Sequence, residues 1–217
     1  PDSVQDGYVL SARFAPIAGH PVLLAHDQLL SGPPGGAFPA PLFDRDPDGW
    51  LVSRDLTAVE IVELNGDGIP DVLTAGTDVI LYQPGEEGSE GIRWRDSLAD
   101  ELLIEPDISD LRQRNPWSLQ AVDLDRDGTD ELWVVYGEFT SGSSSQTDAL
   151  FQLGPSGDYV DVAAAWGLDV IEAGRGAVAA DIDGNGYPDL VRSDLGATDY
   201  WYTQRCGANH WLTVRPR

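Results

Sequence analysis

The chain contains no lysine and no methionine, and its 217 residues include a single cysteine, Cys206. One cysteine excludes a disulfide framework within the chain. We expect the thiol to be a small buried hydrophobic group or, in an oxidising compartment, to pair with another chain or with sequence outside these residues. No apolar run approaches the roughly 20 residues that a transmembrane helix requires, so we expect no membrane span.

Basic residues are also scarce. Arginine supplies all 13 basic residues against 37 acidic ones, and the formal net charge is −24. Nucleic-acid binding requires a basic surface that neutralises phosphates, and anionic lipid would repel this chain. We therefore expect neither nucleic acid nor a membrane surface as a partner. The acidic excess is explained either by a solvated surface or by carboxylates grouped to hold cations, and the positions of the acids favour cations for part of it.

Hydrophobic residues make up 41% of the sequence, which is enough to bury a core. The sequence starts at Pro1 without a methionine and shows no signal peptide. We therefore interpret the chain as a processed or excised piece of a protein.

Three nine-residue segments share one pattern, in which acids or asparagine occupy positions one, three, five and nine and glycine occupies position six. We number them loop one (residues 63–71), loop two (residues 123–131) and loop three (residues 181–189). Their fifth residues, Asp67, Asp127 and Asn185, are separated by 60 and 58 residues. Such regular spacing indicates an internal structural repeat.

The segments around the loops repeat as well, because β-branched and aromatic residues dominate four short runs in each copy. The first runs are residues 58–62, 119–122 and 177–180, and the second runs are residues 72–75, 132–136 and 190–192. The third runs are residues 78–82, 148–151 and 199–202, and the fourth are residues 92–94, 159–162 and 210–214. Four short strands per repeat predict an all-β fold, a β-propeller built of four-stranded blades.

The N-terminal region is similar to a fourth, degraded copy, with runs at residues 11–14, 20–26 and 27–30. Its loop, residues 17–19, has no carboxylate, so we predict no metal there; the alternative is that residues 1–50 are irregular. Residues 44–49 are rich in aspartate, but Pro47 and the lack of a ninth acid favour a solvated turn. We predict one module over residues 1–217 with about four blades: 1–50 without metal, and 51–110, 111–168 and 169–217, each with a metal loop.

The loops have the donors that calcium prefers. Calcium takes six to eight oxygen ligands, and alternate carboxylates in a tight loop converge on one point. The glycine at position six permits the turn that directs the carbonyl of position seven inward. A single Asp-Gly segment would indicate a plain β-turn, but three copies in register favour about three Ca²⁺ ions. The predicted ligands are Glu63, Asn65, Asp67, Ile69 (carbonyl) and Asp71; Asp123, Asp125, Asp127, Thr129 (carbonyl) and Glu131; and Asp181, Asp183, Asn185, Tyr187 (carbonyl) and Asp189.

Loop two carries four acids at these positions and the other loops carry three each, so loop two should bind most tightly. Without a cation the ten acids repel one another, and we expect the metal-free protein to be less stable. Three calcium ions would bring the net charge from −24 to about −18.

The loops and the runs beside them resemble the FG-GAP/VCBS repeat family, the blades of integrin α-subunit propellers and of many bacterial secreted proteins. The resemblance covers roughly residues 57–214. Residues 159–168, 174–190 and 209–215 are similar to the end of the repeats in the CRTAC/ASPIC–UnbV group. The resemblance implies calcium at the loop positions named above and an extracellular, cell-surface or periplasmic location, and it implies no catalytic site. The chain departs from that group in ending at Arg217 and in having about four blades.

No Gly-x-Ser-x-Gly, His-Glu-x-x-His or phosphate-binding glycine loop occurs in the sequence. His20, His26 and His210 are better explained by structural roles, and residues 139–146 by a long hairpin loop. We therefore expect a non-enzymatic, calcium-stabilised binding or adhesion module that recognises protein or glycan. The alternatives are a carbohydrate-active lyase or hydrolase domain, and a structural subunit that contacts further blades or subunits of a surface assembly.

Overall fold

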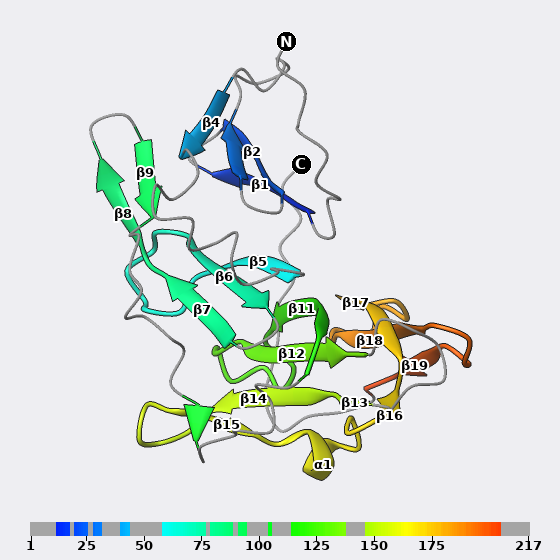
Figure 1. Cartoon of the computed structure of the whole chain (residues 1–217). Helices are drawn as coiled ribbons and strands as arrows, with labels where there is room; N and C mark the ends of the chain where they lie inside the picture. Colours follow the sequence, from blue (N-terminus) through cyan, green and yellow to red (C-terminus); the bar gives the residue numbers. More distant parts are fainter. Residues whose placement is uncertain are drawn as a thin grey trace. The chain divides into compact units, whose positions relative to one another are not determined.

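The computed structural model describes residues 12–17, 20–25, 28–31, 40–43, 58–76, 79–88, 91–94, 104–105, 114–137 and 146–204. These residues are mostly β-strand, with one short helix, α1 (Ala163–Trp166), so the fold is all-β (Figure 1). The chain divides into two compact units, residues 1–101 and 102–217. None of the helices in the described ranges is long and apolar enough to cross a membrane.

The first unit contains three small antiparallel sheets. Strands β1 (Ala12–Ile17), β2 (His20–Ala25), β3 (Gln28–Ser31) and β4 (Ala40–Phe43) form a four-stranded sheet in chain order. Strands β5 (Ala58–Val62), β6 (Asp71–Gly76) and β7 (Val79–Gln83) form a second sheet, and β8 (Gly85–Gly88) pairs with β9 (Gly91–Trp94). Strands β1 to β4 all lie within residues 1–50.

The second unit is built in the same way. Strands β11 (Pro116–Val122), β12 (Glu131–Tyr136), β14 (Ala149–Leu153) and β15 (Tyr159–Asp161) form an antiparallel meander, and β10 (Ile104–Glu105) adds to β15 in parallel. Strands β17 (Gly174–Ala180), β18 (Asp189–Asp194) and β19 (Tyr200–Tyr202) form a three-stranded sheet. A short pair joins β13 (Gln146–Thr147) to β16 (Ile171–Glu172).

One prediction about strand pairing was wrong. The fourth run of the first metal-loop repeat, now β9, pairs with β8 instead of adding to the sheet of β5, β6 and β7. The reason lies at Gly85, whose backbone N–H donates to Asp71 Oδ1 at 2.8 Å and draws the chain back toward loop one. The residues that follow then form a hairpin of their own. No sheet closes on itself among the described strands, so these sheets do not by themselves show a propeller.

The core of the second unit lies where two sheets meet. Trp133 and Val135 of β12 and Leu150 of β14 share one face of their sheet, because Trp133 pairs with Leu150. Leu190 of β18 joins them in one buried cluster, and Ala177, Ala179 and Tyr202 pack against it. The sheet of β17, β18 and β19 therefore covers one face of the sheet that precedes it.

Several predictions concern residues outside the described ranges. They are the state of Cys206, the final run at residues 210–214, the turn at residues 44–49, His26 and His210, and most of the long hairpin loop at residues 139–146.

Candidate metal centre

Each of the three acidic loops connects the first strand of a sheet to the second: β5 to β6, β11 to β12, and β17 to β18. The N–H of position two donates to the carboxylate of position nine, at 3.1, 2.8 and 3.1 Å in loops one, two and three. The N–H of position five donates to the side chain of position three at 2.9, 3.0 and 3.0 Å. The N–H of position seven donates to the side chain of position five at 2.7, 2.8 and 2.8 Å. The sequence repeat is thus a repeat of backbone structure.

Position one differs among the loops for a simple reason. In loops two and three its aspartate accepts the N–H of the glycine at position six, at 3.1 and 3.0 Å. In loop one it is Glu63, and Glu63 Oε1 accepts the N–H of Gly66 at position four, at 2.7 Å. The extra methylene of glutamate brings the carboxylate to a different donor.

Positions four and six both take the left-handed backbone conformation. At position six, Gly68, Gly128 and Gly186 have φ of 79°, 97° and 93°. At position four, loops one and three have glycine, whereas loop two has Arg126 with φ of 63°. A side chain in this conformation costs about 1 kcal/mol relative to glycine. Contacts of the Arg126 side chain offset this cost.

Those contacts reach the neighbouring loop. Arg126 Nε and Nη2 donate to the carbonyl oxygen of Gly186 at 3.1 and 2.6 Å. The guanidinium of Arg126 in loop two is therefore hydrogen-bonded to the backbone of loop three, at the carbonyl of the position-six residue Gly186. Sequence reasoning missed this link, although the replacement of the repeated position-four glycine by arginine was visible.

The closing carboxylate is the most buried part of each loop, since Asp71, Glu131 and Asp189 are almost completely inaccessible to solvent. One oxygen of each accepts the N–H of position two. The second oxygen of Asp71 accepts the N–H of Gly85. The Oδ1 atom of Asp189 is buried and has no hydrogen-bond donor in the described part of the chain. A buried carboxylate oxygen without a hydrogen-bond donor is unfavourable unless a cation binds it. The oxygen ligands of loop three therefore fit a bound metal ion.

Loop two brings three carboxylates together. Oxygen atoms of Asp123, Asp125 and Glu131 all lie within 4.8 Å of one another, which suits one shared cation. Gln152 Nε2 donates to Asp125 Oδ2 and to Glu131 Oε1, both at 3.2 Å, and so holds two of the three in place. Within the described ranges no other set of three acidic, histidine or cysteine side chains is grouped in this way.

Electrostatics make this group costly without a cation. Burial, together with the nearby charges of Asp125 and Asp127, raises the pKa of Glu131 to about 7, although hydrogen bonds from Leu124 and Gln152 oppose the shift. Near neutral pH this carboxyl is therefore shared between its protonated and ionised forms. A divalent cation would replace the proton and stabilise the ionised form.

The other predicted ligands lie in their loops but outside this group. Asp127 is exposed, and its Oδ1 accepts the N–H of Thr129. The exposed residues are Glu63, Asn65, Asp67, Asp181 and Asp183; the half-buried ones are Ile69, Thr129 and Asn185; Tyr187 is buried. Sequence reasoning missed Gln152, which lies 21 residues after Glu131 and has no counterpart in the repeated pattern.

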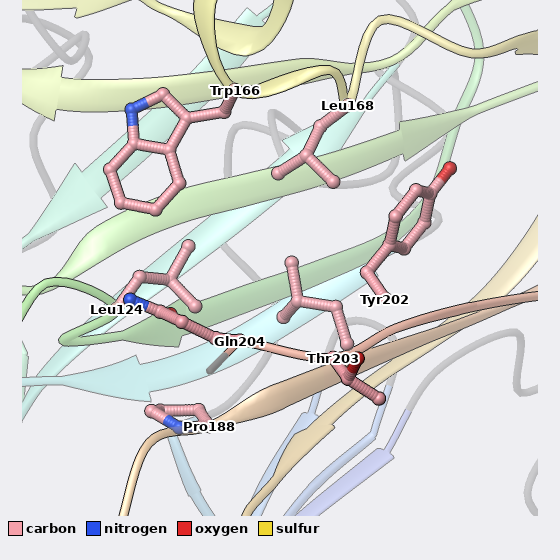
Figure 2. Close-up of a pocket in the computed structure, with 8 residues that line it drawn as sticks. Leu124, Trp166, Leu168, Pro188, Tyr202, Thr203 and Gln204 are labelled. Carbon is pink, nitrogen blue, oxygen red and sulfur yellow. The ribbon is translucent and has the colours of Figure 1, made fainter. Parts of the chain in front are cut away.

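A hollow of about 310 Å³ lies beside loops two and three. Figure 2 shows Trp166 and Tyr202 on two sides of it with Leu168 between them, and the remaining wall is formed by Leu124, Pro188, Leu190, Thr203 and Gln204. Leu124 belongs to loop two and Pro188 to loop three, so the loops shape part of this wall. Asn185 Nδ2 donates to the carbonyl of Gln204 at 2.7 Å, so a further residue of the wall is attached to loop three.

A buried ion pair also links β18 to the residue between β13 and β14. Arg192 Nε lies 2.6 Å from Asp148 Oδ2, and Arg192 also pairs with Asp194; all three side chains are inaccessible to solvent. Asp148 Oδ1 accepts the N–H of Tyr136 at 3.0 Å. Burial raises the pKa of Asp148 to about 7, although Arg192 opposes the shift. This network lies outside the loops and links the sheets at their junction.

No protein-family model matches the chain, and no curated protein matches it.

Proposed function

We propose that the chain is a calcium-binding repeat module, and that loop two is its strongest site. The observation that carries the proposal is the group formed by Asp123, Asp125 and Glu131, whose oxygen atoms lie within 4.8 Å of one another. The donors are carboxylates, and hard oxygen donors favour calcium or magnesium over zinc and copper. Calcium is the better candidate because loop carbonyls and waters can complete its larger and more variable coordination shell.

Loops one and three are proposed to bind calcium more weakly, which gives about three ions per chain. Their hydrogen-bond pattern matches that of loop two, and the buried, unpartnered Asp189 Oδ1 supports a cation in loop three. Each of these loops has one asparagine in place of an acid, Asn65 or Asn185, so its ligand charge is lower. Lower ligand charge generally weakens calcium binding.

We further propose that the sheets are successive blades of a β-propeller of the FG-GAP/VCBS kind. Two observations support this within the second unit. The first strands of the two repeats, β11 and β17, are in contact, and Ser118 Oγ donates to the carbonyl of Ala177 at 3.5 Å. The loops of both repeats also meet through Arg126 and Gly186. Side-by-side first strands with loops at one end are the arrangement expected of propeller blades.

In this proposal calcium stabilises the fold, and the module works outside the cell, at the surface or in the periplasm, by binding protein or glycan. Binding surfaces on such a scaffold do not require catalytic residues. The residues that line the described hollow include no carboxylate pair, so it gives no support to the alternative of a glycoside hydrolase.

Calorimetric titration of calcium into chelator-stripped protein tests the proposal. Asp125→Asn removes one charge from the loop-two group, and Asp169→Asn removes one charge from an exposed position outside the loops. We expect Asp125→Asn to abolish or weaken the tightest site at least tenfold, and Asp169→Asn to leave it unchanged. The proposal is wrong if the unaltered chain binds no calcium, or if both variants change binding equally.

A further inference from the structure

Position four of the metal loops is occupied by a different kind of residue in loop two than in the other two loops. Loops one and three have Gly66 and Gly184 there, with φ of 77° and 74°, whereas loop two has Arg126 with φ of 63°. Glycine takes this left-handed conformation without steric cost, but a residue with a Cβ does not. In the part of the chain that the structure describes, Arg126 is the one residue other than glycine with a positive φ. Such strain persists where surrounding contacts over-determine it, so the contacts of Arg126 show what the strain supports.

The guanidinium of Arg126 is directed at one backbone oxygen. Its Nε and Nη2 atoms donate to the carbonyl of Gly186 at 3.1 and 2.6 Å, and Gly186 is buried. Asp125 and Asp127 flank Arg126 in the sequence, yet the ion pairs within the described ranges do not include Arg126. A guanidinium presents its donors in a fixed planar geometry, so two hydrogen bonds to one carbonyl fix the direction of that carbonyl. Arg126 therefore orients a peptide group of loop three rather than neutralising a carboxylate.

The oriented peptide group joins ligand positions of loop three. Its N–H belongs to Tyr187 and donates to Asn185 Oδ1 at 2.8 Å, while the N–H of Gly186 donates to Asp181 Oδ2 at 3.0 Å. Asp181, Asn185 and the carbonyl of Tyr187 are three of the proposed calcium ligands of this loop. A change in the direction of the Gly186 carbonyl would turn the whole peptide group, because the peptide bond is planar. Arg126 thus holds the backbone that carries these ligands.

The other end of the link is the backbone of loop two. Arg126 follows Asp125, one of the three carboxylates whose oxygen atoms lie within 4.8 Å of one another, and it precedes Asp127. A cation bound to Asp125 would restrain the backbone beside Arg126, and with it the direction of the guanidinium. Loop three would then be ordered in part before it binds an ion, which lowers the entropy cost of that binding. Loop one has Gly66 at this position, which has no side chain to form such a link.

We propose that Arg126 is a positioning residue that couples the two loops, so that loop three binds calcium more tightly once loop two is occupied. This inference rests on the calcium binding proposed above. Coupling between two binding sites is reciprocal, and it typically changes affinity by about 5- to 150-fold. Because the link consists of one side chain on one carbonyl, we expect a value near the lower end, about 5- to 20-fold.

The charge of Arg126 acts in the opposite direction to the coupling. A positive charge beside the loops repels a calcium ion, so its removal by itself would tighten calcium binding. Arg126→Gly removes the charge and the link together, and it places at position four the residue that loops one and three have there. Glycine also suits the left-handed backbone, so the variant relieves strain in loop two. Weaker binding by loop three in this variant would therefore have to come from loss of the link.

Calcium titration followed by amide NMR tests the proposal, because the N–H groups of Gly128 and Gly186 report loops two and three separately. We expect Arg126→Gly to weaken calcium binding by loop three about fivefold or more, and to leave loop two unchanged or tighter. Arg175→Gln is the control, since it removes the same charge near the start of β17, at the end of that strand away from loop three. This control should leave both affinities unchanged.

A second comparison measures the coupling itself. Asp125→Asn, which weakens loop two, should also weaken calcium binding by loop three in the unaltered chain. The same substitution should have a smaller effect on loop three when it is combined with Arg126→Gly, because the link is then absent.

Two results would overturn the coupling while leaving the proposed calcium binding intact. One is an Arg126→Gly variant in which loop three binds calcium as tightly as before or more tightly. The other is an equal weakening of loops two and three, which would indicate general damage to the fold. A different result, in which calcium moves neither the Gly128 nor the Gly186 resonance of the unaltered chain, would overturn the proposed function, and the coupling would fail with it.

Discussion

Replacement of Glu131 by glutamine should have opposite effects on stability with and without calcium. Burial raises the pKa of this carboxyl from an ordinary value of 4.5 to about 7. Each unit of pKa corresponds to about 1.4 kcal/mol, so ionised Glu131 destabilises the metal-free fold at pH 7.5 by up to about 3 kcal/mol. Glutamine has nearly the same shape and no charge, so Glu131→Gln removes this cost in the absence of a cation.

We expect Glu131→Gln to stabilise the chelator-treated protein by about 1–3 kcal/mol, a rise of several degrees in melting temperature for a chain of this length. In saturating calcium the unaltered protein gains the binding free energy and the variant loses much of it, so the order of stability reverses. Thermal denaturation at pH 7.5, in chelator and in calcium, measures both effects. Asp169→Asn, at an exposed position, should change either value by less than about 0.5 kcal/mol.

The reasoning about the acidic group is refuted if Glu131→Gln destabilises the protein in chelator. That result would mean that the hydrogen bond from Leu124, at 2.8 Å, matters more than the cost of the buried charge. Calcium binding by the loop would then have to be judged from the titration alone.

Three further predictions concern the second unit. Gly174→Ala should destabilise the second unit by roughly 1–3 kcal/mol in urea denaturation, because an added Cβ would lie 2.7 Å from the carbonyl oxygen of Tyr136. Gly176→Ala should cost less, because the nearest atom to its added Cβ is a serine hydroxyl that can move. An equal loss of stability in the two variants would contradict the prediction. Arg192→Leu should cost about 3–5 kcal/mol in the same assay, since it leaves the buried Asp148 without its cation, and a loss below about 1 kcal/mol would contradict it. The melting temperature in chelator should rise as the pH is lowered from 7.5 to 5.5, because folding raises the pKa values of Glu131 and Asp148 to about 7. The stability that the folded protein gains from protonating these two groups is lost as the pH rises toward 7. A melting temperature that falls as the pH is lowered would be evidence against the raised pKa values.

Much of the local structure was predictable, because it depends on residues that are close in the sequence. Apolar runs located β5, β12 and β18, and the glycine at position six marked a left-handed turn in each loop. The loop hydrogen bonds join residues two to seven positions apart, so the repeated spacing of the acids is accompanied by a repeated local backbone structure.

The contacts that the sequence did not predict join side chains that are distant in the sequence and are brought together only by the pairing and packing of strands. Gln152 reaches Glu131 only because β14 pairs with β12, and the pattern around β14 gives no sign of this contact. Arg192 and Asp148 are 44 residues apart and meet at a junction of two sheets. The hairpin of β8 and β9 was missed because Gly85, which redirects the chain, carries no signal that separates it from any turn glycine.

Anomalous diffraction from a crystal soaked in calcium would show whether a calcium ion occupies loop two. We expect an anomalous peak between the carboxylates of Asp123, Asp125 and Glu131, about 2.3–2.6 Å from an oxygen of each. Clear density for the three side chains with no peak between them, in a crystal soaked at saturating calcium, would mean that loop two does not bind calcium.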